Sequence, residues 1–116
     1  MRVQSEDRRG VSILRLIGRF VTGSDAELSA AEKSLREAGI SNAILDLSGV
    51  PYVDSTGLAF IVELHKSLIA RGGQLFLTGA GPRVCEVLEM TRIAEIVPMF
   101  ENVAGAEAAL HSEVLC

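Results

Sequence analysis

The sequence predicts an α/β fold: one domain over residues 1–116, built as a mixed β-sheet with helices packed on it. Its length of 116 residues suffices for one hydrophobic core and is too short for two ordinary domains. Hydrophobic residues make up 48% of the chain, a normal share for a globular α/β protein. Short runs with strand periodicity alternate with longer helical patterns, and no linker or repeat separates them. The predicted order of elements is β β α β α β α β α.

Two strands joined by a tight turn open this order. Residues 11–17 alternate apolar and polar side chains well enough for a strand, and Gly18 ends it. Residues 2–6 form an earlier strand, which can pair with the second one through the turn at residues 8–10.

A helix and a buried strand follow. Ser24 or Asp25 can cap the helix, which we expect to run to about Ala38 and to end at Gly39. The compact apolar run at residues 43–47 is typical of a strand that is covered on both faces. Such strands occur in parallel or mixed sheets, which supports the predicted fold class.

The longest helical pattern extends from Thr56 to Arg71, and the two glycines at residues 72–73 end it. His65 falls on the apolar side of this helix, where a partly buried structural histidine is favoured over a catalytic base. The apolar stripe that should face the sheet consists of Leu58, Ile61, Val62, Leu68 and Ile69.

The last third of the chain predicts a strand at residues 74–78 and a helix that starts at Pro82, a residue suited to the first helical position. A short edge strand is expected at residues 96–97 and is stopped by Pro98. An alanine-rich helix over about residues 102–110 completes the domain, with an asparagine as its cap. The apolar side of the helix that starts at Pro82 consists of Val84, Val87, Leu88 and Ile93.

The composition argues against two classes of protein. A net charge of −4 without a basic stripe argues against nucleic-acid binding, which depends on clustered Lys and Arg. The longest apolar run, residues 58–62, is far shorter than the ~18 residues that a membrane span needs, and residues 1–7 contain no apolar signal region. We therefore expect a cytoplasmic protein that does not insert into a membrane.

No cofactor, metal or catalytic residue is expected. Cys85 and Cys116 lack metal-site spacing, and we expect two free thiols, with Cys85 in the core. The glycine-containing turn at residues 79–81 fails as a dinucleotide loop, because Pro82 interrupts it and Val84 occupies the third glycine position. No nucleophile is accompanied by a base and an orienting group, so the chain is not expected to be an enzyme.

The four residues Asp54-Ser55-Thr56-Gly57, just before the longest helix, carry the clearest functional signal. If Asp54 caps the helix, Ser55 occupies the first helical position with its hydroxyl free. Unpaired backbone N–H groups and the helix dipole favour a phosphate at such a helix N-terminus. Gly57 is expected to keep the first turn bare, so that another protein can approach closely. A plain helix cap is the alternative interpretation of the same residues.

The chain resembles the STAS domain family, in particular the bacterial anti-sigma factor antagonists. The resemblance rests mainly on two motifs, Leu47-Ser48-Gly49-Val50 at the end of a strand and Asp54-Ser55-Thr56-Gly57-Leu58 before a helix. The strand after residues 72–73 and the helix from Pro82 are consistent with it. Many family members carry an acidic residue shortly after the glycine that ends the second strand. Here that position reads Gly18-Arg19-Phe20-Val21, so partner contacts of that loop are not carried over.

The resemblance implies a binding protein with a phosphorylation switch. Unphosphorylated, such a protein binds an anti-sigma factor that is also a Ser/Thr kinase. Phosphorylation of Ser55 by this kinase releases it, and a Ser/Thr phosphatase reverses the modification. On this hypothesis Asp54, Ser55, Thr56 and Gly57 contact the partner. The alternative is a STAS accessory subunit that regulates a membrane lipid or anion transporter through the same surface, without a phosphate.

Overall fold

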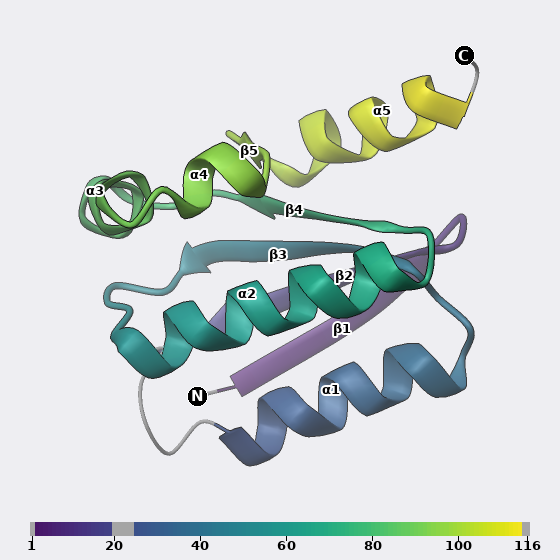
Figure 1. Cartoon of the computed structure of the whole chain (residues 1–116), viewed down its shortest axis with the longest axis horizontal. Helices are drawn as coiled ribbons and strands as arrows, with labels where there is room; N and C mark the ends of the chain where they lie inside the picture. Colours follow the sequence, from purple (N-terminus) through teal and green to yellow (C-terminus); the bar gives the residue numbers. More distant parts are fainter. Residues whose placement is uncertain (1, 20–24, 115–116) are drawn as a thin grey trace.

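The computed structural model describes residues 2–19 and 25–114 and confirms the predicted class, a mixed sheet with helices packed on it (Figure 1). The sheet contains five strands in the order β1-β2-β3-β4-β5. The strands are β1 (Arg2–Arg8), β2 (Val11–Ile17), β3 (Asn42–Gly49), β4 (Gln74–Thr78) and β5 (Met99–Phe100). The helices are α1 (Asp25–Glu37), α2 (Ser55–Ala70), α3 (Pro82–Met90), α4 (Ile93–Ile96) and α5 (Val103–Val114).

Strand direction determines where the loops of the domain gather. β1 pairs antiparallel with β2, whereas β2, β3, β4 and β5 are parallel to their neighbours. Because parallel neighbours end at the same edge of a sheet, the loops that follow β2, β3 and β4 emerge side by side. This edge carries the start of α2.

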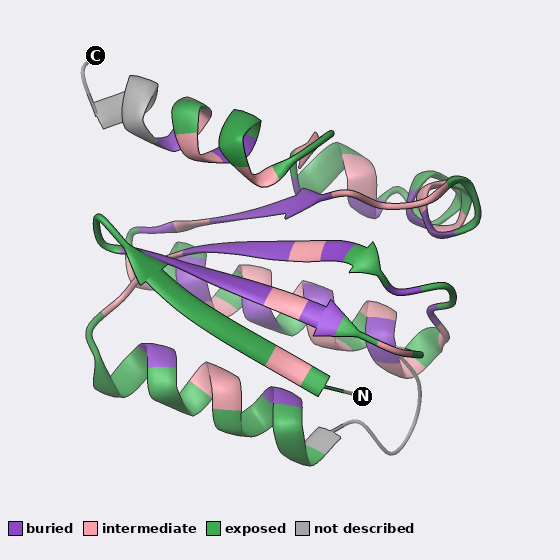
Figure 2. Cartoon of the chain, turned by 180° about the vertical axis from the view of Figure 1, so that it is seen from behind, coloured by how far each residue is buried: buried purple, intermediate pink, exposed green. Residues whose placement is uncertain are grey.

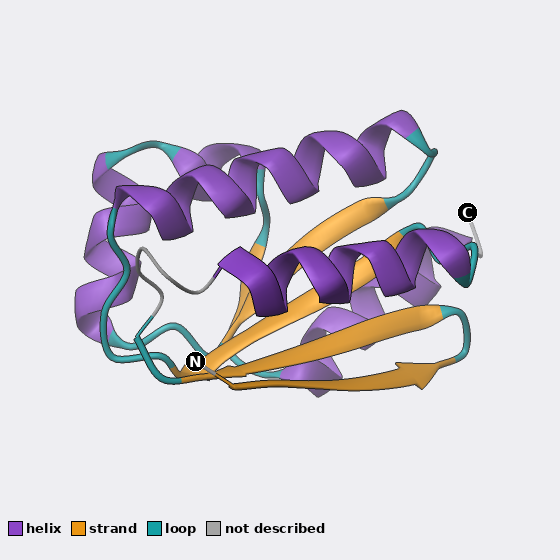
Figure 3. Cartoon of the chain, turned by 90° about the horizontal axis from the view of Figure 1, so that it is seen from below, coloured by secondary structure: helices purple, strands orange, loops and turns teal. Residues whose placement is uncertain are grey.

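Helices cover the two faces of the sheet unequally. α1 and α2 lie on one face and α5 on the other (Figure 3). Successive side chains of a strand point to opposite faces, so Leu45 of β3 packs in the larger core cluster and Ile44 in the smaller one, with Ala106 and Leu110 of α5. The apolar run of β3 is therefore buried on both faces, as its sequence predicts.

The edge strand β1 is exposed along most of its length (Figure 2). Its outer side chains form surface ion pairs: Glu6 lies 2.7 Å from Arg8 and 3.1 Å from Arg15 of the adjoining strand. Exposed pairs of this kind contribute little to stability. Charged residues on an edge strand do, however, discourage edge-to-edge pairing with other chains.

The predicted strand at residues 96–97 is wrong. Ile96 belongs to the short helix α4, which buries Ile93, and the last strand begins after Pro98 rather than before it. Pro98 lacks an N–H, but its carbonyl accepts a hydrogen bond from the Leu77 N–H at 2.9 Å and so starts the pairing with β4. The expected helix through Ile93 is also broken, because Arg92 adopts a left-handed conformation with φ 64°.

Two further expectations about the core are wrong. Ile69 is 52% exposed, because the buried face of α2 is narrower than predicted and runs through Ile61, Leu64 and Leu68. Cys85 is half-buried on the flank of α3, since Val84 and Leu88 take the core-facing positions. Its Sγ lies 3.6 Å from Glu89 Oε1, and burial together with this carboxylate raises the pKa of the thiol.

Other expectations hold or lie outside the described residues. His65 is half-buried, as predicted, and its Nδ1 has no hydrogen-bond partner within residues 2–19 and 25–114. The candidate cap Ser24 and the thiol of Cys116 lie outside the described residues. In the same ranges, no helix combines the length and apolar character that would let it cross a membrane.

The glycine pair after α2 provides a stability test of this fold. A Cβ on Gly73 would lie 1.6 Å from the Ser41 carbonyl oxygen, whereas a Cβ on Gly72 meets nothing within 4 Å, although its φ is +81°. We expect Gly72→Ala to cost about 1–2 kcal/mol for the left-handed conformation, and Gly73→Ala to cost about 3 kcal/mol or more because backbone must move. Urea unfolding of both variants measures the difference. An equal or smaller loss for Gly73→Ala would contradict the close approach of the α2–β4 turn to the α1–β3 loop.

Candidate functional site

The start of α2 is fixed by the side chain of Asp54. Its backbone is extended (φ −103°, ψ −171°), and its Oδ1 accepts hydrogen bonds from the N–H groups of Thr56 at 2.9 Å and Gly57 at 3.1 Å. The Leu58 N–H donates to the Asp54 carbonyl at 3.0 Å, which is the first bond of the helical ladder. Asp54 is therefore the N-cap, as the sequence predicts.

Ser55 is the first residue of α2 and is exposed. Its hydroxyl makes no hydrogen bond with any residue in the described part of the chain. Because Asp54 already satisfies the N–H groups of Thr56 and Gly57, the backbone does not use the Ser55 hydroxyl. That hydroxyl lies at the positive end of a helix of 16 residues, where an added negative group is stabilised.

The turn after β4 lies directly against the last residues of β3. Gly79 has a φ of +67°, and a Cβ there would lie 3.0 Å from the Ser48 Cβ and 3.1 Å from Asp46 Oδ1. Asp46 accepts a hydrogen bond from the Ser48 N–H at 3.0 Å and lies 3.7 Å from the Arg15 side chain. The two acidic residues that flank the β3–α2 loop, Asp46 and Asp54, therefore have separate structural partners.

An open groove of about 500 Å³ separates the β3–α2 loop from the first turn of α3. Tyr52 lies beside it, 41% exposed, with the Arg19 guanidinium 5.7 Å from its ring centroid. Sequence analysis missed Tyr52 and Arg83 as surface features. The sequence signal that could have indicated this groove is the pair of prolines, Pro51 and Pro82, that follow the neighbouring parallel strands β3 and β4. The groove is lined by Ser48, Gly49, Val50, Pro51, Gly81, Pro82, Arg83 and Val84.

Metal chemistry has no support in the described ranges. Within residues 2–19 and 25–114, no three His, Cys, Asp or Glu side chains gather in a way that could hold a metal ion.

Comparison with models of known protein families identifies the family to which this chain belongs. The profile of the STAS domain matches residues 2–106, which is most of the chain and includes the whole Asp54–Gly57 motif. The chain belongs to the STAS family. The predicted family and fold class are thereby confirmed.

Two relatives match this STAS domain over almost their whole length. The anti-sigma F factor antagonist of Paenibacillus polymyxa is 26% identical over 107 residues, which cover 91% of this chain and 92% of the relative. BtrV of Bordetella bronchiseptica, assigned as an anti-sigma factor antagonist, is 30% identical over 110 residues, which cover 94% of each chain.

Solved structures agree with the STAS fold. A crystal structure from Thermotoga maritima, described as an anti-sigma factor antagonist, superposes with a TM-score of 0.84 at 23% identity and covers 94% of each chain. The Bacillus protein SpoIIAA in its phosphorylated form gives a TM-score of 0.73 at 16% identity, covering 93% of this chain and 99% of that one. At these identities the likeness concerns the fold alone.

The structure corrects the expected role of Gly57 in this STAS domain. Gly57 is buried and shares the inner face of α2 with Ile61, Leu64 and Leu68, so it does not leave a bare surface for a partner. Thr56 is half-buried, and Ser55 is the exposed residue of the first turn. A larger side chain at residue 57 would disturb packing before it affected a partner.

The cap provides the stability prediction for this site. Asp54→Ala removes the acceptor of two backbone hydrogen bonds, so we expect the free energy of unfolding to fall by about 1 kcal/mol. Ser55→Ala should cost clearly less, because no described group uses its hydroxyl, and Asp54→Asn should retain most of the cap. Urea unfolding curves of the three variants measure this order. A Ser55→Ala loss as large as that of Asp54→Ala would show that the hydroxyl is structural.

Proposed function

We propose that this STAS domain is an anti-sigma factor antagonist whose partner binding is controlled by phosphorylation of Ser55. The observation that carries the proposal is an exposed, unused hydroxyl at the first position of α2, directly after the Asp54 cap. The names of the full-length relatives support the functional class. The partner on this proposal is an anti-sigma factor with Ser/Thr kinase activity, and a Ser/Thr phosphatase resets the switch.

The helix N-terminus can accept the phosphate without a change of fold. A phosphoserine adds about 1.5–2 negative charges at pH 7. The positive end of α2 stabilises part of this charge, and the exposed position leaves the rest in water. The cap itself is not displaced, because Asp54 binds the N–H groups of residues 56 and 57 rather than that of Ser55.

The phosphate instead acts on the surface that a partner would cover. This surface lies at one edge of the sheet and comprises Ser55 at the start of α2, Tyr52 in the loop before it and the groove beside Arg83. A complex that buries this surface must desolvate a phosphate next to the Asp54 carboxylate. Desolvation and like-charge contacts at an interface cost several kcal/mol, so the phosphorylated form should dissociate.

The position of the phosphate tests the assignment of the acceptor. Incubation with the cognate kinase and ATP should add one phosphate, on Ser55, because this hydroxyl is exposed whereas that of Thr56 is half-buried. Ser55→Ala should abolish the modification, and the matched variant Thr56→Ala should retain it. Mass-spectrometric phosphosite mapping reads the result. A phosphate on Thr56 of the wild type would refute the assignment.

The effect of the phosphate on affinity tests the switch itself. We expect phosphorylation of Ser55 to weaken binding to the anti-sigma factor by more than a hundredfold, equivalent to about 3 kcal/mol. Ser55→Asp should weaken it less, since a carboxylate carries one charge on a shorter side chain. Calorimetric titration of both forms measures this. Equal affinity before and after phosphorylation would rule out the switch.

A pull-down from the source cells separates this function from its alternative. Recovery of an anti-sigma factor kinase supports the proposal. Recovery of a transporter or its ATPase, with binding that ignores Ser55 phosphorylation, supports the accessory-subunit interpretation instead.

A further inference from the structure

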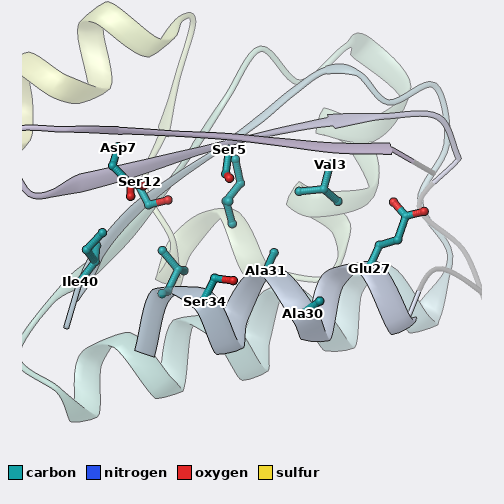
Figure 4. Close-up of a pocket in the computed structure, with 11 residues that line it drawn as sticks. Val3, Ser5, Asp7, Ser12, Glu27, Ala30, Ala31, Ser34 and Ile40 are labelled. Atoms are coloured by element: carbon teal, nitrogen blue, oxygen red, sulfur yellow. The ribbon is translucent and has the colours of Figure 1, made fainter. Parts of the chain in front are cut away.

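A second cavity lies between the edge strand β1 and helix α1 (Figure 4). Its volume is about 320 Å³, within the size range of pockets for small ligands. It shares no lining residue with the groove beside Arg83. The phosphorylation switch does not use this cavity.

The deepest polar group of this β1–α1 cavity is Ser12. Ser12 is 1% exposed, and its hydroxyl makes no hydrogen bond with any residue of the described ranges. The side chain points into the space between the sheet and α1, where Ser5 and Ser34 present further hydroxyls from the two sides (Figure 4). A ligand group that hydrogen-bonds with the Ser12 hydroxyl would therefore not have to displace a protein partner.

The charge of the lining selects a cation. Among the described residues, the charged ones that line the cavity are Asp7, the β1 partner of Ser12 in the sheet register, and Glu27 of α1, and none is Lys, Arg or His. Neither carboxylate forms an ion pair with a residue that the structure describes. Phosphates and other anions would therefore be repelled, whereas an amine can pair with either end.

The length of the cavity favours a long, narrow cation. Figure 4 shows Asp7 and Glu27 at opposite ends of the cavity, with Glu27 at the end where Val3 lies. Val3 precedes Asp7 by four residues on an extended strand, which places the Cα atoms of these two residues about 13 Å apart. Besides the serine hydroxyls, the wall carries apolar side chains, with Val3 and Leu14 from the sheet and Ala31 from the helix.

We propose that the β1–α1 cavity binds a linear polyamine. Its ammonium groups pair with Asp7 and Glu27 at the two ends, an inner nitrogen donates a hydrogen bond to Ser12, and its methylene groups pack along Val3 and Ala31. The cavity is accessible, because β1 is an exposed edge strand with no neighbour on its outer side among the described residues.

Calorimetric titration of the full chain with spermidine tests the proposal. We expect saturable binding of one molecule, weakened about tenfold by Asp7→Asn and by Glu27→Gln, and about threefold to tenfold by Ser12→Ala. Glu63→Gln removes an exposed carboxylate of α2 outside the cavity and serves as the matched control, with unchanged affinity. Both carboxylate variants change exposed side chains, and circular dichroism confirms their folding.

A steric variant and a map of the binding site complete the test. Ala30 is exposed, lines the cavity and lies in α1, so Ala30→Leu should block the cavity while the helix persists. In nuclear magnetic resonance spectra, spermidine should shift the amide signals of Ser12 and Ala31. Absence of saturable binding, an equal loss for Glu63→Gln, full affinity of Ala30→Leu, or shifts confined to other regions would each overturn the proposal.

Discussion

The hydrogen bonds that Asp54 accepts from the Thr56 and Gly57 N–H groups are the contacts on which the site depends. They make Ser55 the first residue of α2, and they satisfy the backbone without its hydroxyl. Had Ser55 itself been the cap, its oxygen would be engaged with the backbone, and modification would remove the bond that starts the helix. Asp54 thus stabilises the helix end, and the hydroxyl of the adjacent Ser55 remains unbonded to the backbone.

The parallel arrangement of β3 and β4 gives this helix end its surroundings. Leu45 pairs with Leu77 in the register, so the loops that follow the two strands emerge together, and Gly79 lets the turn after β4 lie against Ser48 at the end of β3. The exposed ring of Tyr52 and the groove beside Arg83 therefore lie on the same edge of the sheet as Ser55. On the proposed function, a partner that docks here would cover a composite surface rather than a single loop, so one added phosphate would affect the whole contact.

Much of this fold follows from local patterns in the sequence, and the errors have local causes. The Asp54 cap, the exposed Ser55 and the doubly buried β3 were predictable because each depends on neighbours in the chain. The position of β5 was not, since the carbonyl of Pro98 finds its partner on β4, a contact that no local pattern encodes. The orientation of Gly57 was missed for a similar reason: which face of α2 turns inward depends on the packing of Ile61 and Leu64 against the sheet. The family resemblance, by contrast, was carried by motif residues and held.

The central claim is that phosphorylation changes a surface on a fold that is already in place. The most direct test is a comparison of ¹H–¹⁵N nuclear magnetic resonance spectra of the domain before and after complete phosphorylation of Ser55. The account predicts chemical-shift changes confined to the β3–α2 loop, the first turn of α2 and the start of α3, with the amides of β2, β3 and β4 otherwise unmoved. Shifts spread through the sheet, or collapse of signal dispersion, would contradict it.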